Sequence, residues 1–298
     1  MKISFKISCV ALLGALAFGP LLNAQDRPAL TAEQLSRLQI HAVPGKENLY
    51  VMPGFDGGVS GGNIVLLVTD EGVLVVDNKY DYSYPDIMKQ LRTVTDQAVR
   101  YVFNTHHHFD HAGSNAAFMP DIPVLAHRNV RANMLRNGQA GAPEIVYDES
   151  ATVVLGGQEI SAYHFGRGHT SGDSVIHFPA LRTVHTGDLV LKGERLDGST
   201  LSPFFDYANG GSAAEWTATL DGLLTLDFDT VIPGHGPILR KADVRIFRSK
   251  MDQFMTRIQV LIDNGVERDR IAAELDITDL NWPLQPARIE SVYDELTQ

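Results

Sequence analysis

The stretch THHHFDHAG, residues 105–113, decides how this chain folds and what it can bind. Four of its side chains can coordinate a metal ion, and they fall within six positions: His106, His108, Asp110 and His111. Imidazole and carboxylate ligands suit zinc or iron, and the set contains no thiolate. The stretch therefore predicts a site for such metals rather than for copper(I) or an iron–sulfur cluster.

Three fragments later in the chain, each flanked by glycine, supply further candidate ligands: His169, Asp188 and His235. Glycine lets a loop turn sharply enough to aim neighbouring side chains inward. Together with the first four residues they make five histidines and two aspartates. This number of ligands is enough to hold two divalent cations side by side.

The residues before the motif, 99–104, are rich in β-branched and aromatic side chains and predict a strand, so the ligands lie on the loop that leaves it. On an extended backbone, side chains two positions apart project to the same side, whereas the last two ligands of the motif come after a turn. One cation cannot easily take all four. A natural division gives one metal His106, His108 and His169 and the other Asp110, His111 and His235, with Asp188 placed to bridge them.

The motif His106-Xaa-His108-Xaa-Asp110-His111, followed in order by His169, Asp188 and His235, resembles the pattern of the metallo-β-lactamase superfamily. The resemblance covers roughly positions 47–240. It implies an α/β fold, the αββα metallo-β-lactamase sandwich, with two mixed sheets packed face to face, helices outside and both metals at the mouth between the sheets. It also implies two Zn²⁺ ions, with iron or manganese as alternative metals, and a metal-bridging hydroxide as the nucleophile.

For this chain the resemblance implies an exported binuclear zinc hydrolase that attacks the carbonyl of an ester, lactone, thioester or β-lactam. Asp110 would bind metal and orient the hydroxide, which makes it the candidate catalytic residue. Asp188 is typical of the branches similar to glyoxalase II (hydroxyacylglutathione hydrolase) and the lactonases, whereas known zinc β-lactamases generally carry Cys or Ser there. The alternative within the same fold is a mononuclear iron oxidoreductase similar to the persulfide dioxygenases. Complete ligation for two metals favours hydrolysis.

Aromatic residues in two loops are candidates for substrate binding. Phe55 lies in a glycine-rich segment over residues 53–62 and is a candidate apolar flap. A later loop contributes Phe204, Phe205 and Tyr207 as residues that could line the pocket. For each of these side chains, ordinary packing in the core is the alternative interpretation.

Other polar residues near the motif are better interpreted as structural. His107 stands between two ligands, so its side chain should point away from the metals. Asp77 ends an apolar strand, where an acid is costly unless it is hydrogen-bonded, and we expect it to support the metal loop from beneath. His185, three residues before Asp188, could support that ligand.

Composition is that of an exported globular enzyme. Of its 298 residues, 44% are hydrophobic and 20% are charged, which suffices for a full core. Residues 1–24 resemble a secretory signal peptide, because two lysines precede a short apolar stretch over 10–22. We expect a periplasmic or secreted protein in which residues 25–298 form a single metallo-β-lactamase domain with C-terminal helices from about 241. An uncleaved N-terminal anchor is the alternative.

Charge and cysteine content narrow the choice of partners. Removing residues 1–24 takes away two lysines and no acidic residue, so the formal net charge changes from −11 to −13. An anionic surface argues against nucleic acid and leaves a small molecule as the expected substrate. The sole cysteine, Cys9, lies in the signal segment, so the mature chain has no disulfide. No stable membrane insertion is expected after signal cleavage, and the sequence does not indicate the oligomeric state.

Hydrophobic patterning predicts strands alternating with helices in two similar halves, which suits a layered α/β sandwich. Strands are predicted over residues 48–52, 63–69, 72–77, 99–104, 152–155, 159–165, 174–178, 183–186 and 229–232. Helices are predicted over residues 84–94, 126–137, 212–226 and 241–264.

Overall fold

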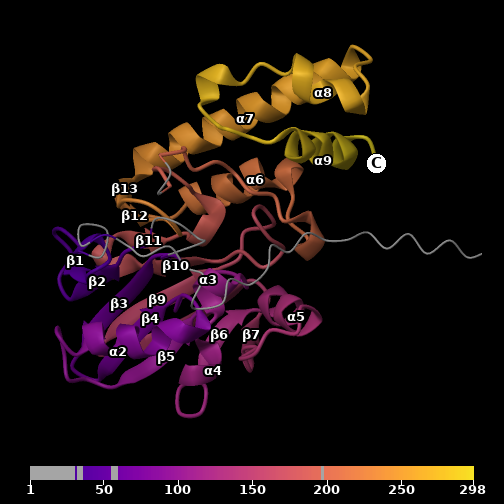
Figure 1. Ribbon diagram of the computed structural model, residues 1–298. Coiled ribbons are helices and arrows are strands. Elements are labelled where there is room, and N and C mark those ends of the chain that lie inside the picture. Colours follow the sequence, from indigo (N-terminus) through magenta and orange to yellow (C-terminus); the bar gives the residue numbers. More distant parts are fainter. Residues whose placement is uncertain (1–30, 32–35, 55–59, 196–197) are drawn as a thin grey trace, which may run out of the picture.

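The computed structural model describes residues 31, 36–54, 60–195 and 198–298 (Figure 1). The expected signal segment, residues 1–24, and the candidate flap Phe55 lie outside the described residues. In the ranges that are described, no helix has both the length and the apolar character needed to cross a bilayer.

The first half of the described chain forms a seven-stranded sheet whose strands follow one another in chain order. These strands are β1 (His41–Ala42), β2 (Leu49–Met52), β3 (Ile64–Thr69), β4 (Gly72–Val76), β5 (Val99–Phe103), β6 (Val124–His127) and β7 (Ile145–Tyr147). Pairing is antiparallel from β1 to β4 and parallel from β4 to β7. The sheet is therefore mixed.

The second half forms a six-stranded sheet in the order β13-β12-β11-β10-β9-β8. Its strands are β8 (Ser150–Leu155), β9 (Gln158–Tyr163), β10 (Val175–Phe178), β11 (Thr183–His185), β12 (Thr230–Ile232) and β13 (Leu239–Arg240). Strands β11 and β12 are parallel neighbours, and the other pairs are antiparallel. This sheet is mixed as well.

Helices lie on the outer side of each sheet (Figure 1). The first half contributes α2 (Tyr84–Leu91), α3 (Phe109–Ala112), α4 (Asn115–Phe118) and α5 (Arg128–Arg136). The second half contributes α6 (Ala213–Leu224), α7 (Lys241–Asp263), α8 (Arg268–Glu274) and α9 (Pro286–Leu296). In Figure 1, α6 lies between the second sheet and the group formed by α7, α8 and α9.

Strand β3 shows why the layers form, because its side chains alternate between two hydrophobic cores. Val65 and Leu67 face the space between the sheets, which they share with residues of the second sheet such as Ile176. Ile64 and Leu66 point outward and pack with residues of α2 and α4. A third core joins the outer face of the second sheet to α6, α7, α8 and α9. The layers are helix, sheet, sheet, helix, which confirms the predicted αββα sandwich.

Two parts of the sequence-based assignment differ from the structure. The helix predicted over 126–137 begins only at Arg128, because residues 124–127 form β6 and pair with β5. A buried run of four residues is too short for its periodicity to separate a strand from a helix. The short strands β1, β7 and β13 were not predicted for the same reason. The long helix predicted over 241–264 is α7.

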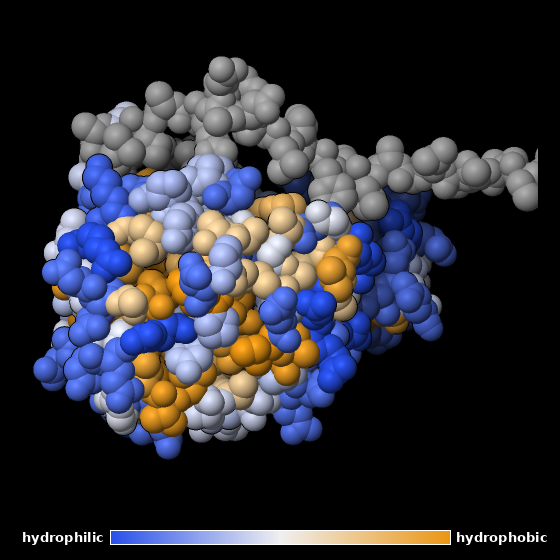
Figure 2. All heavy atoms as spheres, turned by 90° about the horizontal axis from the view of Figure 1, so that it is seen from below, coloured by the Kyte–Doolittle hydropathy of each residue, from blue (hydrophilic) through white to orange (hydrophobic). Residues whose placement is uncertain are grey.

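The outer edges of the two sheets are partly apolar. Figure 2 shows one face of the molecule, on which hydrophobic residues gather among hydrophilic ones. Exposed large hydrophobic side chains include Ile145 and Val154, which lie on the edge strands β7 and β8. The edge strands β1, β7 and β13 are short and offer few unpaired backbone groups, which limits their use as templates for pairing with another chain.

Candidate metal centre

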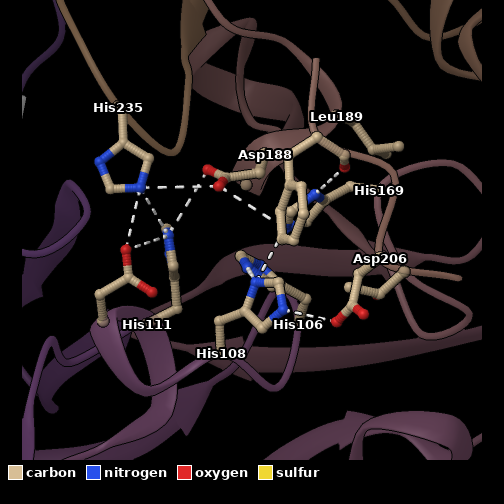
Figure 3. A network of polar contacts seen from close by, with 12 residues as sticks. His106, His108, His111, His169, Asp188, Leu189, Asp206 and His235 are labelled. Carbon is tan, nitrogen blue, oxygen red and sulfur yellow. Dashed lines mark hydrogen bonds and ion pairs between the residues drawn. The ribbon is translucent and has the colours of Figure 1, made fainter. Parts of the chain in front are cut away.

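The seven predicted ligands lie on loops and a short helix at the ends of strands from both sheets. Figure 3 shows six of them together: His106, His108, His111, His169, Asp188 and His235. The loop after β5 carries His106 and His108, and the short helix α3 that follows carries Asp110 and His111. The loop between β9 and β10 carries His169.

The other two ligands come from a parallel pair of strands. Strands β11 and β12 pair up to His185 and Ile232, so the loops that leave them start side by side. One loop carries Asp188 and the other carries His235. Ligands far apart in the sequence therefore meet because the strands before them end at the same level.

The first three histidines form one cluster. His108 Nδ1 lies 3.2 Å from His106 Nε2 and 2.9 Å from His169 Nε2. Two nitrogen ligands of one tetrahedral zinc, each bonded at its usual length, lie about 3.3 Å apart. The cluster of His106, His108 and His169 thus has the spacing of a three-histidine metal site.

Hydrogen bonds on the outer side of two rings fix which nitrogen faces the cluster. His108 Nε2 donates to Asp206 Oδ2 at 2.8 Å, and His169 Nδ1 donates to the backbone carbonyl of Phe204 at 2.7 Å. A carboxylate and a carbonyl can only accept, so the ring proton is on the outer nitrogen. The inner nitrogen of each ring consequently presents a lone pair, the form that binds a cation.

His106 is held in the same way through a neighbour. The Thr105 hydroxyl donates to Asp77 Oδ2 at 2.8 Å and lies 3.1 Å from His106 Nδ1. Since the hydroxyl proton is used on Asp77, the hydroxyl oxygen accepts from His106 Nδ1, and Nε2 carries the lone pair. Three lone pairs then converge without a donor between them, an arrangement that a cation would satisfy.

A second cluster consists of Asp110, His111 and His235. His235 Nε2 lies 3.2 Å from His111 Nε2 and 3.1 Å from Asp110 Oδ2. On its outer side, His111 Nδ1 donates to Asp77 Oδ2 at 2.8 Å. Asp77 is fully buried and also accepts from the Thr105 backbone N–H, which agrees with its predicted structural role.

Asp188 lies between the two clusters, as Figure 3 shows. Its Oδ2 is 3.6 Å from His169 Nε2 and 3.6 Å from His235 Nε2, and its Oδ1 is 3.5 Å from His111 Nε2. Among the described residues, the buried Oδ1 has no hydrogen-bond partner. A buried, unsatisfied carboxylate oxygen beside two groups of ligands fits a carboxylate that bridges two cations.

Without a bound metal, the pKa of His111 in the second cluster is shifted in the opposite direction to the pKa values of His106 and His169 in the first. Burial, and then the neighbouring histidines, hold the pKa of His106 well below its usual value and lower the pKa of His169 to about 4. For His111, burial opposes the charge, but Asp110 and Asp188 outweigh it and raise the pKa to about 10. His106 and His169 are therefore neutral at pH 7, whereas His111 is charged and paired with Asp110 and Asp188.

Two further buried polar residues, His185 and Lys79, hold backbone segments near the ligands. His185 Nδ1 accepts from the Gly187 backbone N–H at 3.0 Å, beside Asp188, so His185 supports that ligand as expected. Lys79 was not predicted. Its ammonium group donates to the carbonyls of Pro53 and Ser60, at 2.8 Å each. Burial lowers the pKa of Lys79 to about 7, against the attraction of Asp110.

The candidate pocket residues fall into different environments. The Phe204 ring is partly exposed and lies 6.0 Å from the His108 ring and 5.6 Å from the His169 ring, at the edge of the first cluster. Phe205 is instead buried and stacks on Phe254 in the core, so the pocket role expected for it is replaced by packing.

Tyr207 also departs from the expected pocket. Its ring packs against the same core, and its hydroxyl donates to Glu295 Oε2 at 2.8 Å. The Tyr207 ring packs against apolar side chains while its hydroxyl reaches the Glu295 carboxylate, so tyrosine suits this position.

Asp206 is another residue of the site that the sequence did not predict. It contacts His108 from a distance of 98 positions in the chain, and no motif precedes it. Its Oδ2 also lies 3.8 Å from Nε2 of His107, which is buried. Within the described residues, neither ring nitrogen of His107 has a hydrogen-bond partner. Only the folded arrangement places Asp206 beside the histidine motif.

Comparison with known proteins agrees with this geometry. The chain matches the metallo-beta-lactamase superfamily over residues 57–235. It is 27% identical to metallo-beta-lactamase IND-1 of Chryseobacterium indologenes, over 64% of this chain and 80% of that protein. It is 29% identical to 2,4-dinitroanisole O-demethylase subunit alpha of Nocardioides sp. (strain JS1661), over 56% of this chain and half the length of that protein.

Solved structures show the same architecture. The metallo-beta-lactamase from Pontibacter korlensis has a TM-score of 0.62 and 20% identity, covering 72% of this chain and 99% of that one. The family match includes all seven predicted ligands, and the two sheets have the expected layers. The chain belongs to the metallo-β-lactamase superfamily. Its relatives and its His/Asp clusters support a metal-dependent hydrolase.

Proposed function

We propose that this protein is an exported binuclear zinc hydrolase that cleaves a carbonyl compound, namely an ester, a lactone, a thioester or a β-lactam. The observation that carries the proposal is the presence of two separate ligand clusters with Asp188 between them. A mononuclear iron dioxygenase of the same fold needs only part of this ligand set, so it is not favoured.

Two zinc ions at these clusters would supply hydroxide at neutral pH and polarise the substrate carbonyl. His106, His108 and His169 would hold one ion, Asp110, His111 and His235 the other, and Asp188 would contact both. Asp110, 3.1 Å from His235, would also orient the attacking water by accepting its hydrogen bond.

We assign substrate binding to the side of the metal centre on which Phe204 lies, next to His108 and His169. Its exposed ring offers an apolar wall beside the first cluster. Asp188 in place of a cysteine lowers the expectation of β-lactam hydrolysis and favours esters, lactones and thioesters. The calculated charge of the mature chain favours a small molecule over nucleic acid. Residues 1–24 support export to the periplasm or beyond.

The test combines metal analysis with a substrate panel. Purified protein lacking residues 1–24 should hold about two zinc equivalents and hydrolyse at least one ester, lactone, thioester or β-lactam. His106→Ala and His235→Ala should each lose about one equivalent and most of the activity, because they deplete different clusters. His41→Ala changes an exposed histidine and serves as the control. A single tightly held iron, with no site for zinc, would contradict the proposal.

A further inference from the structure

Helix α9 lies far along the chain from the histidine motif. The carboxylate of its residue Glu295 contacts the first residues of α6. Glu295 Oε2 accepts from the backbone N–H groups of Ala213 at 3.0 Å and Ala214 at 3.3 Å. Its Oε1 accepts from the Ser212 hydroxyl at 2.5 Å. The first N–H groups of a helix have no partner within the helix, so Glu295 satisfies them from outside and places a negative charge at the positive end of α6.

The same carboxylate holds the loop that leads into α6, residues 203–212. Its Oε2 also accepts from the Tyr207 hydroxyl. Glu295 therefore binds this loop at two points, Tyr207 and Ser212, as well as the helix that follows. Hydrogen bonds to an ionised group are about twice as strong as neutral ones, so this anchor is a strong one.

The loop between these anchors contacts two predicted metal ligands. Its Asp206 accepts from His108 Nε2 at 2.8 Å, and the Asp206 backbone N–H donates to the carbonyl of His169 at 2.9 Å. Asn209, also in the loop, donates to Asp206 Oδ2 at 2.6 Å. The position of Asp206 thus depends on the loop, and the orientation of the His108 ring depends on Asp206.

A second residue of α9 holds the other end of the loop. Arg288 donates to the Pro203 carbonyl at 3.3 Å, and its guanidinium lies 4.6 Å from the centre of the Phe204 ring. Arg288, near the start of α9, therefore holds the start of the loop, and Glu295, near the end of α9, holds the rest of it. The family match ends at residue 235, so α9 lies outside the part of the chain that carries the shared motifs.

We propose that Glu295 is a positioning residue of the metal centre, acting through the 203–212 loop and Asp206 on His108. This inference rests on the proposed function in one respect, that the cluster of His106, His108 and His169 binds a metal. Outer partners of ligating histidines typically change metal affinity by about 10- to 100-fold when they are removed. One step further out, Glu295 should have a smaller effect of the same kind.

The experiment measures metal affinity site by site. Full-length metal-free protein is titrated with Co²⁺, whose visible spectrum reports the geometry of each site, and then with Zn²⁺. The variants are Glu295→Gln, Asp206→Asn and the double variant. Asp294→Asn is the matched control, because Asp294 is the neighbouring acid on α9 and pairs with Arg268 rather than with α6.

We expect Glu295→Gln to weaken the three-histidine site by about three- to tenfold and to shift its Co²⁺ spectrum, with the Asp110, His111 and His235 site unchanged. Asp206→Asn should weaken the same site by about 10- to 100-fold. The double variant should resemble Asp206→Asn alone, since residues that act through one another are not additive. Asp294→Asn should match the wild type.

Two results would overturn the inference while leaving the proposed function intact: equal affinities in wild type and Glu295→Gln, or losses that add fully in the double variant. A wild-type protein that binds no metal at either cluster would overturn both. If Glu295→Gln does not fold, Tyr207→Phe removes a single contact to the same carboxylate. A Tyr207→Phe protein whose three-histidine site keeps wild-type affinity and spectrum would then count against the inference.

Discussion

At the scale of single residues, each of four histidines at the metal centre is oriented by an acceptor on its outer side. The acceptors are of three kinds: a carboxylate for His108 and His111, a backbone carbonyl for His169, and a hydroxyl for His106. For His106, His108 and His169 the outer acceptor holds the ring proton, so the lone pairs face inward before any ion arrives. This preorganisation lowers the cost of assembling the site around a metal. His111, whose pKa is raised to about 10, must instead lose its inner proton when a metal binds.

Asp188→Ser should weaken binding of the second metal by about tenfold or more. The carboxylate offsets the repulsion between two cations, and its loss removes a ligand as well as a charge. Hydrolysis should fall at low zinc and recover in part when zinc is added. Activity is measured against zinc concentration for both proteins. Asp227→Ser, which changes an exposed carboxylate, is the control, and superimposable curves for Asp188→Ser and wild type would show that Asp188 is not a ligand.

Asp173→Asn should change how stability depends on pH. Asp173 is buried against Thr170, and burial raises its pKa to about 7, well above the value of about 3.9 in an unfolded chain. Ionisation of Asp173 therefore costs more in the folded state, so wild-type stability should decrease as the pH rises from about 4 to 7, by up to about 4 kcal/mol. The asparagine variant should lack this contribution.

Urea unfolding of the metal-free proteins at pH 5 and pH 8 tests the prediction for Asp173. The difference in unfolding free energy between the variant and the wild type should move in favour of the variant at the higher pH. A difference that is the same at both pH values would mean that Asp173 titrates normally.

The ligands themselves could be predicted from the sequence because their spacing is local or their flanking residues are distinctive. Asp206 and Thr105 could not be assigned in the same way, since an acceptor on the outer side of a ring has no required spacing from that ring. Phe205 was predicted to line the pocket but lies in the core, for a similar reason. Adjacent residues of a loop face different sides, and only the packing partners decide which side is buried.

At the scale of elements, tight turns bring the ligand loops together. A Cβ added at Gly234 would lie 1.9 Å from Asp188 Oδ1, and one added at Gly62 would lie 2.2 Å from His111 Cε1. No side chain larger than hydrogen fits at either point without moving a ligand. Gly234, which flanks His235, and Gly62, in the glycine-rich segment, therefore each make room for a ligand that lies in a different loop.

Gly234→Ala should displace Asp188 and reduce zinc content to about one equivalent, with most of the activity lost. Zinc content and turnover of the purified variant provide the measurement. Gly265→Ala is the control, because an added Cβ there would meet nothing within 4 Å, although its positive φ introduces backbone strain. Normal zinc content in Gly234→Ala would mean that the loop after β12 yields more easily than the structure indicates.

Long or strongly alternating elements were predictable, whereas some of the short strands, namely β1, β6, β7 and β13, were not. The β3–β4 hairpin and α7 follow their predicted ranges closely, because each has enough residues to display its period. Strands of two to four residues such as β6 and β13 exist only because a neighbouring strand pairs with them. Their formation is decided by tertiary contacts that single-sequence patterns do not contain.

At the scale of the whole molecule, the metal centre joins the two halves of the sandwich. Asp110 and His111 follow strand β5 of the first sheet, while Asp188 and His235 follow strands β11 and β12 of the second. Ions bound here would link the two sheets as well as serve the chemistry. Ligands that bind only the folded state stabilise it, by about 2.7 kcal/mol per site at a concentration 100 times the dissociation constant.

Removing the metals with a chelator should therefore lower the melting temperature by several degrees. Thermal unfolding with and without chelator gives the measurement. The double variant His106→Ala, His235→Ala should show a much smaller shift, because each change removes a ligand of one cluster. A chelator effect of equal size in this variant would place the stabilising ion elsewhere.

The order of the ligands along the chain also sets the order of events during synthesis. Only four of the seven ligands have been made when the ribosome passes His111, and the last, His235, follows nearly all strands of the second sheet. Glu295 comes later still. The ligands of the first cluster are complete once His169 has been made, whereas the second cluster waits for His235, so the two sites become able to bind an ion at different stages of synthesis. A chain that crosses a membrane unfolded would acquire its metals on the far side, from whatever supply that compartment offers.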